Sequence, residues 1–296
     1  MNKKILGIFL VLIIAVVLLI SLGASELELE NVLNNAQAIF ENDLGIIELH
    51  FIDVGQGDST LVILPNGKTM LIDAGTSDKG STVVSYIKSL NVSKIDYLVM
   101  THPDADHIGG MSKVIDNFDI GNIYMTDRIS TTKTFEDLLL KIESKNLNIT
   151  TLKANDTISE FNDGKVILLS PIKKYDDSNE MSLVIQIIYK NNTFLFMGDA
   201  GYKVENDILN SNANIKADLI KIGHHGSSYS SSIRFIEKVS PLFAIISVGK
   251  NNRYGHPTNQ TLETLKKIGA KIYRTDESGD IIAISDGNSI NITSKN

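Results

Sequence analysis

The sequence predicts a folded domain in which α-helices and β-strands alternate, of the α/β or α+β class. Short apolar runs rich in Ile, Val, Leu and Phe are bounded by Gly, Asn and Pro, as strands usually are. Between them lie stretches whose apolar residues recur at helical spacing. The chain has 296 residues and 43% hydrophobic content, which is enough for one large domain or two small ones.

The N-terminal residues 1–25 predict a transmembrane anchor. Lys3 and Lys4 precede an uncharged stretch, residues 5–25, that is about as long as a helix needs to cross a bilayer. This stretch has no polar face, so it does not suit a globular helix. The basic flank predicts a cytoplasmic N terminus with the rest of the chain outside. The alternative is a cleaved signal peptide with a small-residue site at residues 21–23, which would give a secreted protein.

Residues 26–45 are acidic and Asn-rich, and we expect a linker there, followed by one domain at residues 46–296. A Pro-Asn-Gly sequence at residues 65–67 predicts a hairpin turn. Strands are predicted at residues 46–51, 59–64, 69–72, 95–100, 123–125, 166–169, 183–189, 193–197, 219–222, 243–248, 271–274 and 281–284. Helices are predicted at residues 83–90, 111–117, 135–145, 204–209, 233–238 and 261–268. This order is compatible with two mixed sheets that have helices outside.

The segment after the strand at residues 95–100 packs two histidines and two aspartates into six positions, from His102 to His107. Imidazole and carboxylate ligands at the end of a buried strand suit Zn, Mn, Fe or Co. Without a cation, these ionisable groups would resist burial together. Gly109 and Gly110 then let the backbone turn tightly beside a bound ion. The alternative is a solvated acidic loop that happens to hold two histidines.

Composition narrows the chemistry further. Cys is absent, which excludes thiolate ligands, disulfides and a cysteine nucleophile. The net charge is −7, and without Lys3 and Lys4 the chain has 26 basic residues against 35 acidic ones. This balance argues against a long basic track for duplex DNA, because phosphate contacts need Lys and Arg. A short single-stranded or monoester substrate stays compatible with it.

The motif that begins at His102, His-x-Asp-x-Asp-His-x-Gly-Gly, resembles the signature of the metallo-β-lactamase fold, with Asp104 in place of the usual middle His. This variant is similar to the extracellular hydrolase domain of the ComEC competence proteins and their stand-alone relatives. Five further segments match that subgroup in order, at residues 51–59, 71–75, 196–200, 221–227 and 254–257. The resemblance covers residues 46–285. It implies an α+β fold, the αββα four-layer sandwich, here with an N-terminal transmembrane helix.

The resemblance also implies a centre that holds two divalent ions, zinc or manganese. Its ligands would be His102 and Asp104 for the first ion, Asp106 and His107 for the second, Asp199 as the bridge, and His224 as the last ligand. Two such ions can activate a water molecule, which Asp106 would orient, so no protein nucleophile is required. Asp73 and Asp53 are expected to support the ligands from behind, and the turn at residues 55–58 either shapes the pocket floor or is a simple hairpin turn.

One departure from the family pattern affects the first ion. No His occurs between His107 and His224, so the usual third protein ligand is missing. Asn179 or Ser182 would supply a weaker oxygen ligand. An oxygen-rich site of this kind favours Mn²⁺ over Zn²⁺. Of the six histidines only His50 lies apart from the motif segments, and we expect it to be structural.

Three side chains are candidates for substrate contact. His225 adjoins His224, and at most one of the two is expected to face the same ion; register favours His224, but His225 could be the ligand instead. Ser227 could donate to an anionic group if a helix begins there, or could cap its own turn. His256 is a candidate general acid or phosphate contact, and the alternative is an exposed histidine in a turn.

The expected function is a membrane-anchored, outward-facing, metal-dependent hydrolase. Similarity to the ComEC-like domains favours a phosphodiester substrate in a nucleic acid or nucleotide. One alternative is hydrolysis of a lactam, lactone or thioester by the same metal centre, and another is a non-catalytic binding domain. The chain has no multi-helix transport segment, so DNA uptake is not implied.

Overall fold

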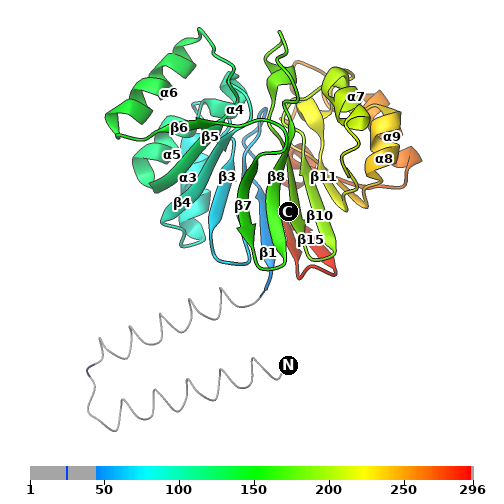
Figure 1. Cartoon of the computed structure of the whole chain (residues 1–296), viewed down its shortest axis with the longest axis horizontal. Helices are drawn as coiled ribbons and strands as arrows, with labels where there is room; N and C mark the ends of the chain where they lie inside the picture. The colour runs from blue at the N-terminus through cyan, green and yellow to red at the C-terminus, as the bar shows by residue number, and fades with distance from the viewer. Residues whose placement is uncertain (1–24, 26–44, 295–296) are drawn as a thin grey trace. The chain divides into compact units, whose positions relative to one another are not determined.

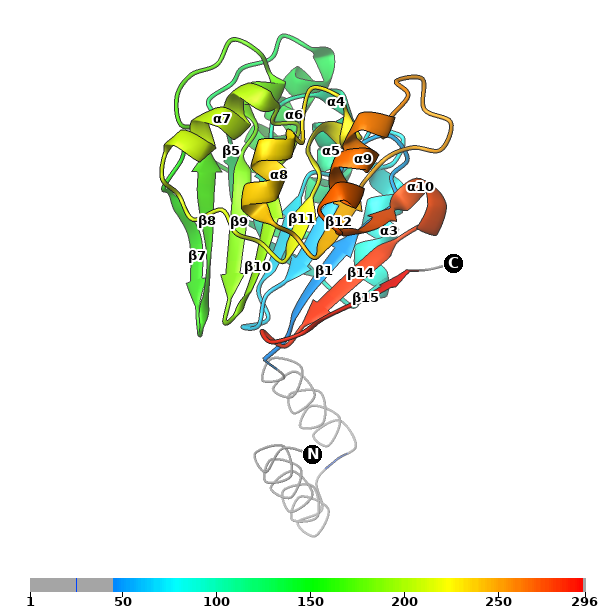
Figure 2. The ribbon, with the colours of Figure 1, turned by 90° about the vertical axis from the view of Figure 1, so that its right-hand side faces the viewer.

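The computed structural model describes residue 25 and residues 45–294. Residues 46–294 contain two β-sheets packed face to face, with helices on the outer side of each sheet (Figure 1, Figure 2). This is the αββα sandwich that the family resemblance implies. No helix within the described ranges has the length and apolar character needed to span a bilayer. The predicted anchor at residues 1–25 and the predicted linker at residues 26–45 lie outside the described ranges, except for residues 25 and 45.

The first sheet has eight strands in the order β15-β14-β1-β2-β3-β4-β5-β6. They are β1 (Ile47–Phe51), β2 (Thr60–Ile63), β3 (Thr69–Ile72), β4 (Lys94–Met100), β5 (Asp119–Met125), β6 (Ile149–Thr151), β14 (Ile281–Ser285) and β15 (Ile290–Ser294). Pairing is antiparallel from β15 to β3 and parallel from β3 to β6. The parallel connections carry α3 (Gly80–Ser89), α5 (Met111–Asn117) and α6 (Lys133–Ser144) on the outer face.

The second sheet has seven strands in the order β13-β12-β11-β10-β9-β8-β7. They are β7 (Thr157–Phe161), β8 (Gly164–Ser170), β9 (Val184–Tyr189), β10 (Asn192–Phe196), β11 (Leu219–Lys221), β12 (Phe243–Ile246) and β13 (Lys271–Arg274). Its helices are α7 (Tyr202–Asn210), α8 (Ile233–Val239) and α9 (Asn259–Lys267). Pairing is antiparallel from β7 to β10 and parallel from β10 to β13, so each sheet repeats the plan of the other.

Three apolar cores follow from these layers. The central one lies between the sheets, where Phe51 of β1 stacks near Phe196 of β10 with ring centroids 6.1 Å apart. A second core lies between the first sheet and its helices, and a third between the second sheet and its helices. The central strands are buried on both faces, which explains why they read as apolar runs in the sequence.

The sequence missed the edge strands β6, β7 and β15, and also the first half of β5. These segments carry exposed polar residues, so they lack the apolar run from which a strand is predicted. It also missed four short helical turns, which are α4 (Ala105–Ile108), η1 (Asn179–Met181), η2 (Gly223–Gly226) and α10 (Thr275–Ser278). Three of these four turns carry or adjoin residues of the site described next.

Candidate metal centre

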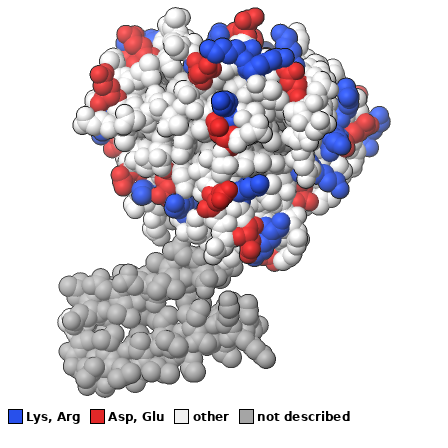
Figure 3. All heavy atoms as spheres, in the orientation of Figure 1, with Lys and Arg blue, Asp and Glu red and all other residues white. Residues whose placement is uncertain are grey.

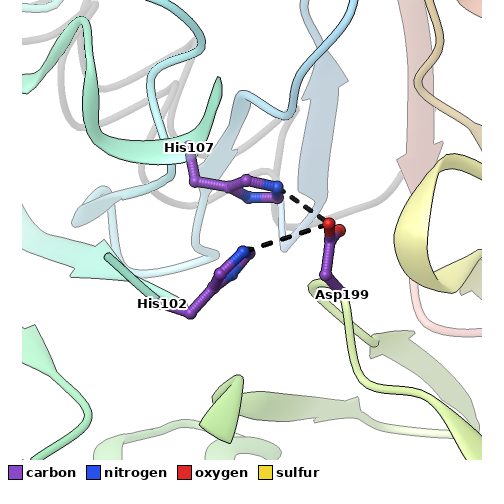
Figure 4. Close-up of side chains that lie close together, drawn as sticks. All are labelled: His102, His107 and Asp199. Atoms are coloured by element: carbon purple, nitrogen blue, oxygen red, sulfur yellow. Dashed lines mark ion pairs between the residues drawn. The ribbon is translucent and has the colours of Figure 1, made fainter. Parts of the chain in front are cut away.

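Segments that follow three strands meet at one place. β4 leads into residues 101–110, which we call the first ligand loop, β10 leads to Asp199, and β11 leads into residues 223–232, the second ligand loop. His107 Nε2 lies 3.3 Å from Asp199 Oδ1, and His102 Nε2 lies 3.9 Å from Asp199 Oδ2. Figure 4 shows both imidazole rings directed toward the Asp199 carboxylate. The fold therefore brings together residues that are far apart in the sequence.

Asp73, which follows β3, fixes the first ligand loop. Its Oδ1 accepts the Thr101 N–H at 2.8 Å, and its Oδ2 accepts the Thr101 hydroxyl at 2.7 Å. Oδ2 also accepts the His107 Nδ1–H at 2.7 Å, which leaves Nε2 as the atom that can bind a metal. The sequence expectation that Asp73 supports the ligands from behind therefore agrees with these contacts.

His102 is held in the same way from the other side. Its Nδ1 lies 3.0 Å from Thr101 Oγ1 and 3.3 Å from Ser182 Oγ. Because the Thr101 hydroxyl already donates to Asp73, it accepts the His102 Nδ1–H, and Nε2 is again the free atom. Asp104 is 43% exposed, its Oδ2 lies 3.9 Å from His102 Nε2, and its Oδ1 accepts the Ser178 hydroxyl at 2.7 Å.

The glycine pair of the first ligand loop is required by close packing. A Cβ at Gly110 would overlap the carbonyl oxygen of Ala74, and one at Gly109 would lie 2.5 Å from the amide nitrogen of Ser77. The backbone thus packs directly onto the segment that follows Asp73, a close approach that requires glycine at both positions.

The second ligand loop uses a left-handed backbone, with φ of 49° at His224 and 52° at His225. His225 is 2% exposed, and its Nε2 lies 3.4 Å from Asp106 Oδ2 and 3.7 Å from Asp199 Oδ2. Its Nδ1 donates to the Ser247 carbonyl at 3.0 Å, so Nε2 faces the two carboxylates. His224 is 26% exposed, and its Nε2 lies 3.7 Å from Asp199 Oδ2.

Potential ligand atoms within 4.8 Å of one another form four overlapping groups among the described residues. They are His102, His107 and Asp199; Asp106, His107 and His225; Asp58, Asp199 and His225; and Asp58, Asp73 and His107. His225 belongs to two groups and His224 to none. The geometry thus favours the alternative in which His225, rather than His224, completes the centre.

The donor atoms fit a cation. The Nε2 atoms of His102, His107 and His225 and the Oδ1 atom of Asp199 are buried, and none has a hydrogen-bond partner within the described chain. Their separations of 3.3 to 3.9 Å lie at the long end of the hydrogen-bond range or beyond it. They match two ligands that share one ion, because tetrahedral Zn–N bonds of about 2.0–2.1 Å place ligand atoms about 3.3 Å apart. Imidazole and carboxylate suit Zn²⁺ or Mn²⁺.

The pKa values of the cluster show that its carboxylates stabilise positive charge nearby. Burial disfavours the charged form of His225, but Asp199, Asp58 and Asp106 outweigh burial and raise the pKa of His225 to about 10. Burial likewise opposes ionisation of Asp199, yet His107 and His225 hold the pKa of its carboxyl well below the ordinary value. In the metal-free protein, protonated histidines supply the charge that a cation would otherwise bring.

Asp58 is a site residue that the sequence reasoning did not assign. It is buried in the turn at residues 55–58, pairs with Lys221 Nζ at 2.8 Å, and has its Oδ1 3.2 Å from His225 Nδ1. Burial works against its charge, but Lys221 and His225 together hold the pKa of Asp58 well below its usual range. The sequence signal that indicates a role for Asp58 is its position in the motif segment at residues 51–59. The turn thus forms part of the site floor, because the Asp58 N–H donates to the Asp106 carbonyl.

Ser227 and Ser182 do not take the roles that the sequence suggested for them. Ser227 is buried and its Oγ accepts the Tyr229 N–H, while α8 begins only at Ile233, so Ser227 caps its own turn and no helix N terminus forms there. Ser182 bonds to His102 Nδ1 and accepts the Asp199 N–H, so it supports ligands instead of facing an ion.

His256 lies beside the metal centre, whereas Asp53 lies outside it. The His256 ring lies 5.7 Å from the His224 ring, and its buried Nδ1 has no hydrogen-bond partner within residues 45–294. Burial, then His224 and His225, lower the pKa of His256, so its imidazole is neutral at pH 7. Asp53 belongs to none of the four groups, and its Oδ1 accepts the Gly55 N–H within its own turn. His50 is buried against Tyr86, as expected for a structural histidine.

The chain is similar to known proteins over most of its length. The family described as the metallo-beta-lactamase superfamily matches residues 52–250. "ComE operon protein 3" of Bacillus subtilis (strain 168) is 30% identical over an alignment of 252 positions that covers 79% of this chain and 32% of that protein. "Competence protein ComA" of Neisseria gonorrhoeae is 30% identical over 245 residues, which are 82% of this chain and 32% of that protein. The chain thus spans about a third of the length of these two relatives.

A solved structure supports the fold. CmlA, a diiron β-hydroxylase from Streptomyces venezuelae, superposes with a TM-score of 0.52 at 12% identity. The match covers 77% of this chain and 52% of that one. At such low identity the likeness concerns the αββα architecture alone.

Proposed function

Because the chain belongs to the metallo-beta-lactamase superfamily, whose fold is typical of metal-dependent hydrolases, we propose that it is a metal-dependent phosphodiesterase that cleaves single-stranded nucleic acid or nucleotides. The competence relatives support this substrate class, since competence is the uptake of DNA by cells. The domain is similar to only part of those relatives, so transport is not included in the proposal.

The observation that carries the proposal is the set of buried, inward-facing Nε2 and carboxylate atoms without hydrogen-bond partners in the described chain. A structural cluster of buried polar groups would satisfy these atoms internally. We propose His102, Asp104 and Asp199 for one ion, and Asp106, His107, His225 and Asp199 for a second, with zinc or manganese bound. His224, the ligand favoured by sequence register, is then an outer neighbour of the centre.

Divalent ions bound there would polarise a phosphodiester and lower the pKa of an attacking water. Asp106 is only partly buried, so its carboxylate can accept a hydrogen bond from that water and orient it. His256 is half-buried and lies next to His224. A bound phosphate would raise the pKa of His256 and let it donate a proton to the leaving oxygen.

The surface charge favours a short or single-stranded ligand over duplex DNA. Acidic and basic side chains are interspersed on the face shown in Figure 3, where a short basic band at the upper edge is flanked by acidic residues. Duplex binding relies on many phosphate contacts from Lys and Arg. A strand held mainly by the metal centre needs fewer of them.

The test is metal content and turnover of the full-length chain with bis-p-nitrophenyl phosphate and single-stranded DNA, with added Mn²⁺ or Zn²⁺. Asp106→Ala should lower turnover by more than about 100-fold, while Asp137→Ala, a change on the exposed surface of α6, should have no effect. Bound metal without turnover on either substrate would redirect the assignment to a lactam, lactone or thioester. Absence of both would leave a non-catalytic binding domain.

We also propose that residues 1–25 anchor the protein in the membrane with the hydrolase domain outside the cytoplasm. The support is the uncharged run at residues 5–25 behind Lys3 and Lys4. The full chain should resist alkaline carbonate extraction from membranes and be digested by protease added to spheroplasts. Recovery of the chain in the extracellular medium, without residues 1–25, would indicate a cleaved signal peptide instead.

A further inference from the structure

The loop between β12 and α9 brings positive charge and an aromatic ring to the edge of the metal centre. Residues 249–257, which we call the platform loop, contain Lys250 and Arg253 and no acidic residue, in a chain of net charge −7. The Tyr254 side chain of this loop is 53% exposed. Aromatic rings combined with nearby cations bind the bases and phosphates of single strands.

Three rings lead from the metal centre to the surface, and we call them the ring ladder. His224 Nε2 lies 3.7 Å from Asp199 Oδ2. The His256 ring meets the His224 ring edge to face at 5.7 Å, and the Tyr254 ring stacks on His256 at 5.8 Å with an interplanar angle of 26°. Tyr254 is therefore the direct ring neighbour of His256, the residue proposed to contact the phosphate.

The platform loop holds Tyr254 on a fixed backbone. Asn252 Oδ1 accepts the N–H groups of Tyr254 and His256, both at 3.1 Å, and its amide donates to the His256 carbonyl at 2.6 Å. Beyond the loop, the Thr258 N–H donates at 2.9 Å to the carbonyl of Gly226, which follows His225. A ring held in this way loses little conformational freedom when it binds a partner.

Arg253 completes the arrangement. Its guanidinium carbon lies 5.0 Å from the centroid of the Tyr254 ring, and its Nη2 donates to the Tyr254 hydroxyl at 2.9 Å. The guanidinium thus lies over the Tyr254 ring at cation–π distance, close enough to meet the phosphate of a nucleotide whose base packs against this pair.

We propose that Tyr254 and Arg253 form a binding platform for the nucleobase and phosphate of a nucleotide adjoining the scissile bond. This inference rests on the proposed function and names its substrate as a base-bearing strand. Stacking on Tyr254 would be tolerant of sequence, because every base offers a π face. Arg253 would interact with the backbone, not with the identity of the base.

The test compares equilibrium binding of two fluorescent probes to the full-length chain, with Ca²⁺ in place of Mn²⁺. One probe is a short oligothymidylate, and the other is an abasic strand of the same length. The wild type should bind the base-bearing strand about tenfold more tightly. Tyr254→Leu should bring this ratio close to one, whereas Tyr254→Phe should preserve it. Tyr229→Leu is the matched control, because Tyr229 is 73% exposed on the second ligand loop and outside the ring ladder.

The outcomes separate the platform from the proposed function. A wild-type ratio near one, a ratio unchanged in Tyr254→Leu, or an equal loss in Tyr229→Leu would overturn the platform. Turnover of bis-p-nitrophenyl phosphate and DNA by the wild type is measured in parallel. Base-dependent binding that requires Tyr254, without turnover, would support the platform and contradict the phosphodiesterase. Arg253→Gln should weaken both probes by a similar factor, and selective loss of the base-bearing probe would contradict the role given to Arg253.

Discussion

The first and second ligand loops position their histidines by different means. In the first loop, Asp73 accepts three hydrogen bonds and fixes His107, and the residues of this loop avoid positive φ. In the second loop, His224 and His225 both take the left-handed conformation. The second loop is held by groups outside it, above all the buried carboxylate of Glu205 on α7. The comparison teaches that His107 is placed by a side-chain acceptor on the neighbouring strand end, whereas His224 and His225 are placed by a strained backbone.

Strain in the second loop is offset by several contacts. A left-handed residue other than glycine costs roughly 1–2 kcal/mol. The Ser230 hydroxyl donates to the Gly223 carbonyl at 2.8 Å, and the Ser231 and Ser232 N–H groups both donate to Glu205. Strained backbone of this kind persists at functional sites only where the surroundings over-determine it.

The largest effect is expected when the first loop loses its partner. Asp73→Ala leaves the Thr101 N–H, the Thr101 hydroxyl and the His107 Nδ1–H buried without an acceptor, so we expect a loss of about 3–5 kcal/mol in the free energy of unfolding. Urea denaturation with and without metal measures it. Asp78→Ala, on the exposed turn after β3, is the control and should leave the midpoint unchanged. A wild-type midpoint in Asp73→Ala would mean that other contacts hold the first loop.

Glu205 should make the stability of the second loop depend on pH. Burial raises the pKa of Glu205 from 4.5 to about 7, although the Ser231 and Ser232 N–H groups favour its charge, and Glu180 nearby raises it further. The folded state therefore binds this proton more tightly than the unfolded state. The contribution of this tighter proton binding to the free energy of unfolding is about 3 kcal/mol at most. It is fully present below about pH 4.5 and is lost as the pH rises from about 4.5 to about 7.

Glu205→Gln removes the titrating group and checks this dependence. The wild type should lose stability relative to Glu205→Gln as the pH rises from about 4.5 to 7, while groups common to both proteins cancel in the difference. Urea unfolding of both proteins across this range, with a chelator present, measures it. Parallel curves for the two proteins would show that Glu205 keeps an ordinary pKa in the fold.

The same contrast explains what the sequence could predict. The central strands and the first loop are encoded locally, as apolar runs and as ligands spaced from His102 to His107. The sequence leaves the choice between His224 and His225 as the ligand open, because both have the same chemistry and only the backbone conformation decides which ring turns inward. Asp58 and Lys221 pair across 163 positions, and no local pattern announces such a contact. The edge strands β6, β7 and β15 lack a signal because many of their residues are exposed.

The next largest effect should distinguish the two histidines of the second loop. His225→Ala removes a buried Nε2 that faces Asp106 and Asp199, so metal affinity should fall by more than about 100-fold. His224→Ala removes a partly exposed ring that lies in none of the groups of ligand atoms, and affinity should change much less. Isothermal titration with Mn²⁺ and Zn²⁺ compares the two variants. A larger loss in His224→Ala would restore the ligand that sequence register favours.

The smallest effect is expected at the exposed edge of the first loop, where Asp104 is the least buried of the proposed ligands. Ser178→Ala removes the hydroxyl that donates to Asp104 Oδ1 at 2.7 Å, a loss of about 1 kcal/mol. The ion assigned to His102, Asp104 and Asp199 should then bind about fivefold less tightly, with the other ion unaffected, in a titration that resolves both. Ser144→Ala, whose hydroxyl bonds within α6, is the control. An equal loss of affinity for both ions would mean that Ser178 supports the whole centre. The two ion sites would then be coupled more closely than the separate anchoring of the two ligand loops implies.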